Sequence, residues 1–148
     1  ESFEVACVDV DGQARIGRGH AARRTIEDDV IAVELSSGEE VLCNATHPFR
    51  LHDGEYVPAG KLWAGAALTP CSLITDARYI TVLRVRKTGE RVWLYDITVD
   101  DYACFGIGQG VVVHNSGYGS RVLQFERELK QLLPAIRAKY RMPGLAVM

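Results

Sequence analysis

The first 115 residues consist of short runs in which apolar and polar positions alternate, with turn-forming residues between the runs. Phe3, Val5 and Cys7 occupy every second position before Asp11-Gly12, a pair typical of hairpin turns. The glycines of 105–110 indicate a tight turn, and 58–67 indicates a loop with one helical turn. Further strands are expected at 13–24, 29–35, 40–43, 49–51, 56–57 and 111–113, and a hairpin at 79–99 with its turn at 87–90. Many short strands separated by frequent turns predict an all-β domain.

The pattern changes after residue 115, where apolar residues recur three and four positions apart, as on one face of a helix. Ser120 is a candidate N-cap, Pro143-Gly144 marks an end, and Pro134 should kink or divide the helix. The apolar positions are Leu129, Leu132, Leu133, Ile136 and Tyr140. The charge changes at the same place, because residues 1–115 carry 17 acidic and 11 basic side chains whereas 116–148 carry 2 and 6. We therefore predict two parts, an all-β domain over 1–115 and a mainly helical tail over 116–148.

Composition excludes several classes of function. Hydrophobic residues make up 47% of the 148-residue chain, which is enough for the core of one ordinary domain. The net charge of −2 favours neither a nucleic acid nor a membrane surface as a partner. No apolar run is long enough to span a membrane, and no secretory signal pattern is present in the sequence. These features predict a cytoplasmic protein.

The four cysteines lie at wide and irregular spacing, without a C-x-x-C pair. This spacing argues against a zinc ribbon or a disulfide scaffold, so we expect reduced and mostly buried thiols. Residue type alone would allow a metal site at Cys43, His47 and His52, but nothing in their spacing requires one. We predict no bound metal and no cofactor.

The bond between Asn115 and Ser116 has a distinctive chemistry. The side-chain amide nitrogen of an asparagine can attack its own backbone carbonyl, which forms a succinimide and breaks the chain after it. A fold that fixes the attack geometry could supply several kcal/mol of that barrier. His114 precedes the bond, and an imidazole has an intrinsic pKa suited to protonating a departing amine near neutral pH. Ser116 supplies a hydroxyl nucleophile on the far side of the bond. A strand end running into a turn is the alternative interpretation of this stretch.

Three separated stretches place chemically useful residues in a fixed order along this all-β chain. His47 follows a predicted strand in the sequence Asn-Ala-Thr-His-Pro-Phe, and Asp96 lies in Leu-Tyr-Asp-Ile-Thr-Val. The His114-Asn115-Ser116 triplet begins 18 residues after Asp96. This order resembles the Hint superfamily of inteins, bacterial intein-like domains and Hedgehog autoprocessing domains, with inteins as the nearest match. The resemblance covers nearly all of residues 1–116 and implies a horseshoe-like, Hint-type β-fold that performs autocatalytic protein splicing.

The resemblance also implies a role for each residue. His47 would polarise the amide at the N-terminal splice junction, and Asp96 would couple that step to branching. His114 would be the penultimate histidine and Asn115 the terminal asparagine that cyclises. Ser116 would be the first residue of the C-extein, the flanking host segment, and would accept the acyl group. Such a domain processes itself once and is not a multiple-turnover enzyme.

Departures from the family pattern refine this expectation. The family usually has Thr at the position of Asn44, which can still support the site by hydrogen bonding. Many members have His at the position of Ala103. Alanine cannot transfer a proton, so this chain lacks one proton relay for asparagine cyclisation. Inteins begin with a Cys or Ser nucleophile in a first block of some tens of residues, and nothing in this sequence matches that block. We therefore expect a C-terminal mini-intein piece over 1–115, naturally split or truncated, followed by C-extein over 116–148. Its partner would be an N-terminal intein fragment.

Two other classes of function remain open from the sequence. A bacterial intein-like domain would keep the fold and mainly cleave itself. A non-catalytic β-domain with a helical interaction tail would perform no chemistry at Asn115. The behaviour of Ser116 and Asn115 variants distinguishes these classes.

Overall fold

The computed structural model describes residues 2–114 and the backbone of residues 124 and 125. This part of the chain forms strands and one short 3-10 turn, η1 (Ala59–Lys61). The strands are β1 (Ser2–Val8), β2 (Ala14–Leu35), β3 (Glu40–Cys43), β4 (Pro48–Arg50), β5 (Tyr56–Pro58), β6 (Ala67–Leu68), β7 (Ile80–Val99), β8 (Cys104–Gly106), β9 (Val112–His114) and β10 (Gln124–Phe125). Within the described residues, no helix has the length and apolar character needed to cross a membrane. The predicted all-β class is confirmed.

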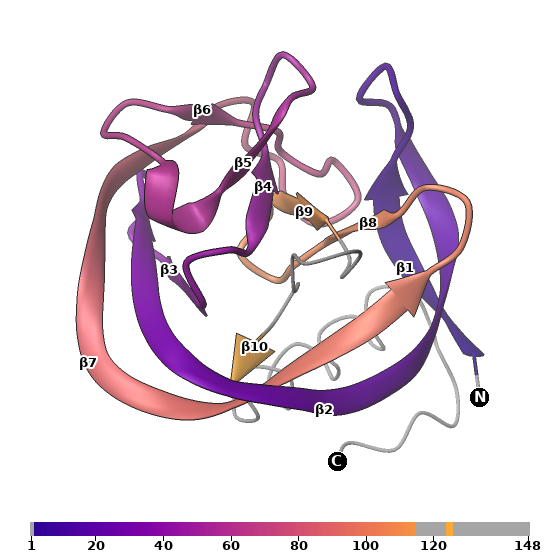
Figure 1. Cartoon of the computed structure of the whole chain (residues 1–148). Coiled ribbons are helices and arrows are strands. Elements are labelled where there is room, and N and C mark those ends of the chain that lie inside the picture. Colours follow the sequence, from indigo (N-terminus) through magenta and orange to yellow (C-terminus); the bar gives the residue numbers. More distant parts are fainter. Residues whose placement is uncertain (1, 115–123, 126–148) are drawn as a thin grey trace.

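Two sheets share the core. The larger sheet runs β1-β2-β7-β10, with β3 paired to β2 and β6 paired to β7, and the smaller sheet runs β5-β4-β9-β8. The long strands β2 and β7, of 22 and 20 residues, curve together as a U-shaped ribbon around the smaller sheet (Figure 1). The ribbon therefore forms the wall of the fold, and the short strands lie inside its curve.

A continuous apolar run in β2 explains how the ribbon is covered on both faces. Ile31 and Val33 belong to the main core, which they share with Phe49 of β4. Val30 and Ala32 point to the opposite face, where they join Leu42 and Leu94 in a second cluster. Successive strand residues face opposite sides of a sheet, so both sets of side chains can be buried only if both faces are covered.

The predicted separation of 13–24 from 29–35 is wrong, because both runs belong to β2. The predicted hairpin turn at 87–90 is wrong as well, because β7 continues through it. The runs on either side of this stretch pair with β2 and not with each other, as the partners Ile31↔Lys87 and Asp29↔Arg91 show. Gly89 has a φ of +78°, a conformation that suits a hairpin turn and a strand irregularity equally.

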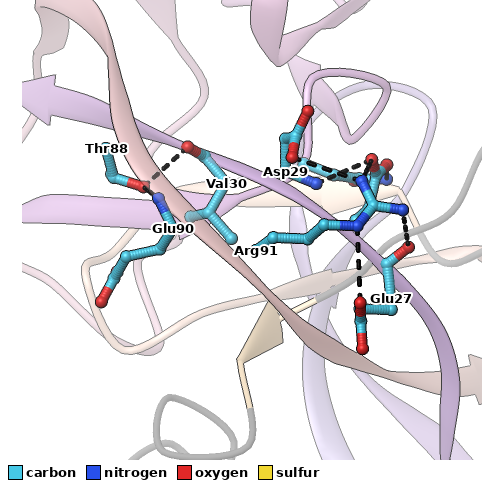
Figure 2. A network of polar contacts seen from close by, with 8 residues as sticks. Glu27, Asp29, Val30, Thr88, Glu90 and Arg91 are labelled. Atoms are coloured by element: carbon cyan, nitrogen blue, oxygen red, sulfur yellow. Dashed lines mark hydrogen bonds and ion pairs between the residues drawn. The ribbon is translucent and has the colours of Figure 1, made fainter.

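Side-chain contacts fix the irregular stretch of β7 against β2 (Figure 2). The Thr88 hydroxyl donates to the Val30 carbonyl at 2.8 Å and accepts the Glu90 N–H at 3.1 Å. Arg91 reaches back to β2, with Nη1 3.3 Å from Asp29 Oδ1 and Nε 3.4 Å from Glu27 Oε1. The hydroxyl replaces ladder hydrogen bonds that the irregularity interrupts, and the ion pairs lie on the solvent side.

The remaining predictions differ mainly in boundaries. β3, β4 and β5 lie within about one residue of the predicted strands, and β1 contains the alternating positions Phe3, Val5 and Cys7 but ends at Val8, before the predicted turn. η1 is the helical turn expected within 58–67. The glycine-rich stretch 105–110 begins inside β8 and turns only after Gly106. β10 is a short strand in the segment predicted to be mainly helical, and it pairs with β7. The predicted helical positions 129–140 lie outside the described residues.

Phe49 connects the two sheets, so its truncation tests this account of the core. Its side chain is fully buried in the main cluster. Replacing Phe49 with Ala should lower the free energy of unfolding by about 3–5 kcal/mol, because it removes apolar contacts and leaves a cavity. Tyr79 is 80% exposed, so the control Tyr79→Ala should change that free energy by less than about 0.5 kcal/mol. Urea denaturation followed by fluorescence measures both, and equal effects would contradict the assignment of Phe49 to the core.

Candidate functional site

A tight turn between β3 and β4 holds the first predicted site residues. The His47 N–H donates to the Asn44 carbonyl at 3.2 Å, which closes the turn. The Ala59 N–H of η1 donates to the His47 carbonyl at 2.8 Å, so the 3-10 turn fixes it from the other side. The imidazole of His47 is fully buried, and its centroid lies 5.1 Å from that of the Phe49 ring. His47 is therefore part of the packed interior and not a surface loop residue.

Asn44 links this turn to the ribbon. Its Nδ2 donates to Asp28 Oδ2 at 3.2 Å and to Thr46 Oγ1 at 3.1 Å. Asp28 belongs to β2 and lies 3.9 Å from Arg91 Nη1, so the contact extends into the ion-pair network of the bend. The Asn44 Oδ1 is buried and has no hydrogen-bond partner among the described residues. Asn44 thus presents a buried hydrogen-bond acceptor in the same turn as His47.

The second histidine lies at the same end of the smaller sheet. His114 is the last residue of β9, which pairs antiparallel with β4 through Phe49↔Val113. His47 precedes β4 by one residue, and in an antiparallel pair the start of one strand lies beside the end of the other. The fold thereby places the backbones of two histidines that are 67 positions apart in the sequence at the same end of this strand pair.

Asp96 lies on the larger sheet, in β7, and its side chain is buried. Its Oδ2 is 3.3 Å from Arg23 Nη2, and its Oδ1 accepts the Ile97 N–H at 2.8 Å. Arg23 also donates to the Thr98 hydroxyl at 3.2 Å. A buried carboxylate is costly without a partner, and the guanidinium of Arg23 offsets that cost. This contact places Asp96 firmly in the wall of the fold.

Two of the predicted site residues, Asn115 and Ser116, lie outside the described residues. The continuous described stretch ends beside them at His114, the final residue of β9. Their assigned chemistry remains a prediction from the sequence.

All four cysteines are buried, and none of them forms a disulfide bond. Burial raises the pKa of the Cys7 thiol to about 12, with neighbouring Cys104 and Cys71 adding to the effect. Burial also raises the pKa of Cys43 and of Cys104. Neutral thiols are poor nucleophiles, so these cysteines act as small apolar residues near neutral pH. No cluster of three or more His, Cys, Asp or Glu side chains suited to a metal ion occurs in the described part of the chain.

One residue that sequence reasoning did not single out, Tyr56, packs against His114. The ring of Tyr56, in β5, meets the imidazole edge to face, with centroids 4.9 Å apart and an interplanar angle of 90°. Arg50 of β4 is Tyr56's register partner and is itself buried. Its Nη1 donates to Thr69 Oγ1 at 2.8 Å and its Nη2 to the Val10 carbonyl at 3.2 Å. In the sequence, the one feature that could have drawn attention to Arg50 is its charge within the otherwise apolar strand 49–51.

Comparison with solved structures identifies this fold. A DnaB intein from Synechocystis sp. PCC 6803 aligns with a TM-score of 0.67 and 20% identity, over 79% of this chain and 81% of that chain. The Ssp DnaB mini-intein variant M86 aligns with a TM-score of 0.65 and 21% identity, over 78% and 77%. The fold is that of an intein. The gp41-1 intein aligns with a TM-score of 0.56 and 13% identity, over 78% of this chain and 100% of that chain. The Hint-type fold expected from the sequence is confirmed, whereas no family model and no curated protein matches the sequence.

Arg23 is predicted to stabilise the intein-like fold through Asp96. Replacing Arg23 with Gln should lower the free energy of unfolding by about 1–3 kcal/mol, because the buried carboxylate loses its charged partner. The exposed Arg18 lies on the same strand, and Arg18→Gln should change stability by less than about 0.5 kcal/mol. Chemical denaturation of both variants at equal ionic strength is the measurement. Indistinguishable variants would mean that the Arg23–Asp96 contact has no energetic weight.

The buried thiols predict a loss of stability at alkaline pH. The folded Cys7 keeps its proton up to about pH 12, whereas a thiol in the unfolded chain ionises near its ordinary pKa of 9.0. The unfolded state therefore binds fewer protons above that value, and the free energy of unfolding should fall as the pH rises from about 9 towards 12. A Cys7→Ala variant should show a shallower fall over the same range. If the free energy of unfolding falls with pH at the same slope in both proteins, Cys7 does not contribute to the loss of stability and this interpretation is wrong.

Proposed function

We propose that this chain is a self-processing domain of the protein-splicing type, acting at the Asn115–Ser116 bond. Support comes from one observation above all: an intein-like fold brings His47 and His114 to the same end of the β4–β9 pair. His114 immediately precedes the bond that asparagine chemistry would break. The fold and the local chemistry of the sequence therefore point to the same peptide bond.

The bond-breaking step is an intramolecular displacement at Asn115. Its side-chain nitrogen attacks its own backbone carbonyl carbon, a carbon–nitrogen bond forms, and the bond to the Ser116 nitrogen breaks. The attacking amide loses one proton and the leaving amine gains one, so the step needs no external reactant. The His114 imidazole is the group assigned to protonate the leaving amine. A half-buried histidine serves this role well, because it can exchange protons with solvent between events.

The steps that precede cyclisation involve the other predicted residues. His47 would polarise the amide at the N-terminal junction, where a nucleophile converts it to an ester or thioester. The acyl group would then pass to the Ser116 hydroxyl, with Asp96 coupling the two events. Asn44 is the supporting residue, since its buried Oδ1 is an acceptor close to His47. A final shift of the acyl group from oxygen to nitrogen would restore a peptide bond.

We assign the junction nucleophile to a separate N-terminal intein fragment. Among the described strands, β1 lies at the end of the larger sheet and pairs with β2 alone, so this edge is available for strand addition. Residues 1–115 have an excess of acidic side chains, which favours a neutral or basic partner. Residues 116–148 would be the C-extein that the reaction joins to another chain or releases.

Intact mass spectrometry tests the proposed cleavage. The purified 148-residue chain, kept for a day near pH 7 alone and with a short N-terminal intein fragment, should lose Ser116–Met148. An Asn115→Ala variant should keep its full mass, because alanine has no nucleophilic amide. An unchanged parent mass under both conditions would contradict the proposal and favour a non-catalytic β-domain.

Mainly cleavage, as in bacterial intein-like domains, is the second candidate outcome. Ala103 lacks the imidazole that many inteins have at this position, so asparagine cyclisation would have one proton relay fewer in either case. A Ser116→Ala variant distinguishes the outcomes, because alanine cannot accept the acyl group. If splicing dominates, the variant should lose the ligated product while retaining cleavage at residue 115. Identical products from parent and variant would establish self-cleavage as the main reaction.

A further inference from the structure

Tyr56 is the aromatic neighbour of His114, and the splicing chemistry proposed above gives it no role. The two rings meet at right angles with centroids 4.9 Å apart, a geometry in which one ring directs its edge at the face of the other. Tyr56 comes from β5 and His114 from β9, on either side of the central strand β4. The contact therefore bridges three strands of the smaller sheet and depends on their assembly.

The other end of the Tyr56 side chain is anchored. Burial raises the pKa of its hydroxyl, and the neighbouring Cys104 thiol adds to this effect. The hydroxyl also interacts with the buried Arg50 guanidinium. Cys104 is the register partner of His114 across β8–β9, and its Sγ donates to the Val8 carbonyl at 3.4 Å. Tyr56 is thus held by β4 and β8 while its ring meets the residue at the end of β9.

These anchors leave Tyr56 little freedom. Arg50 is fixed by Thr69 Oγ1 at 2.8 Å and by the Val10 carbonyl at 3.2 Å. Its register partner across β4–β5 is Tyr56 itself, so backbone pairing and side-chain contact act on the same residue. A ring held in place by this pairing forms a wall for the imidazole that packs against it.

We propose that Tyr56 is a positioning residue that fixes the orientation of the His114 imidazole for proton transfer at the Asn115–Ser116 bond. The inference rests on the proposed splicing function and deepens it. The proton donor at a breaking bond must be held close to the departing nitrogen, and a rotated imidazole loses that alignment. An aromatic ring can supply this constraint without taking or giving a proton, so Tyr56 acts through His114.

Histidine-selective nuclear magnetic resonance tests the contact directly. The full chain is labelled at histidine and carries Asn115→Ala so that it stays intact, and His114→Gln identifies the His114 signals. Replacing Tyr56 with Leu should shift the His114 ring resonances strongly, because the ring current of the tyrosine is lost. Tyr56→Phe should leave them close to the parent, and Tyr79→Leu is the matched control on an exposed tyrosine. If Tyr56→Leu fails to fold, Tyr56→Met replaces it.

Rates of cleavage at the Asn115–Ser116 bond, with Asn115 restored, test the consequence. Tyr56→Leu should slow the reaction by about tenfold and Tyr56→Phe by less than about threefold, as expected for misalignment of a general acid. Unmoved His114 resonances, or moved resonances with an unchanged rate in a parent that cleaves, would overturn the positioning role alone. A parent that never cleaves, with or without the N-terminal fragment, would overturn the proposed function and this role with it.

Discussion

Pairing of β2 with β7 is the constraint on which the rest of this structure depends. The two strands stay paired around a full bend, with register irregularities between His20/Arg23, Arg24/Glu27, Asp29/Ile31 and Glu34/Leu35. Irregularities of this kind bend a strand and increase its twist. Only a curved ribbon can enclose the smaller sheet, bury Phe49 between the two and present both faces of 30–33 to apolar clusters. The Asn44–Asp28 contact joins the histidine turn to this wall, so the site inherits the rigidity of the ribbon.

Local patterns were sufficient to predict part of this architecture. Alternation of apolar positions identified β1, β3 and β4, and it placed His47 after a strand and His114 at the end of one. Local patterns could not predict the continuity of β7, because Lys87-Thr88-Gly89-Glu90 contains residues that suit either a reversal or a bulge. Which of these forms depends on the partner strand, and here Ile31 and Asp29 of β2 pair on either side of the stretch. That choice is non-local.

The residues of the site likewise fall into those that the sequence can predict and those that it cannot. Chemistry carried by neighbouring residues, such as His114-Asn115-Ser116, can be read from the sequence because the reacting groups are adjacent. Contacts made across the fold cannot be read from the sequence. Asn44 lies 16 positions from its partner Asp28, and Tyr56 contacts His114 only when β4 lies between their strands. The buried Arg50 gave a weak signal, a charge in an apolar strand, but its partners Thr69 and Val10 lie 19 and 40 positions away in the sequence. Such supporting residues determine how well a reactive sequence is held, and they become visible only in three dimensions.

The reaction proposed for this chain is cleavage by asparagine cyclisation and not by hydrolysis. The most direct test is the exact mass of the new C-terminus at Asn115, measured immediately after cleavage at mildly acidic pH, where imides hydrolyse slowly. This account predicts a C-terminal succinimide, one water lighter than the free acid, that converts to the acid when the pH is raised. A free carboxylic acid from the first time point would contradict it, because that product requires attack by water.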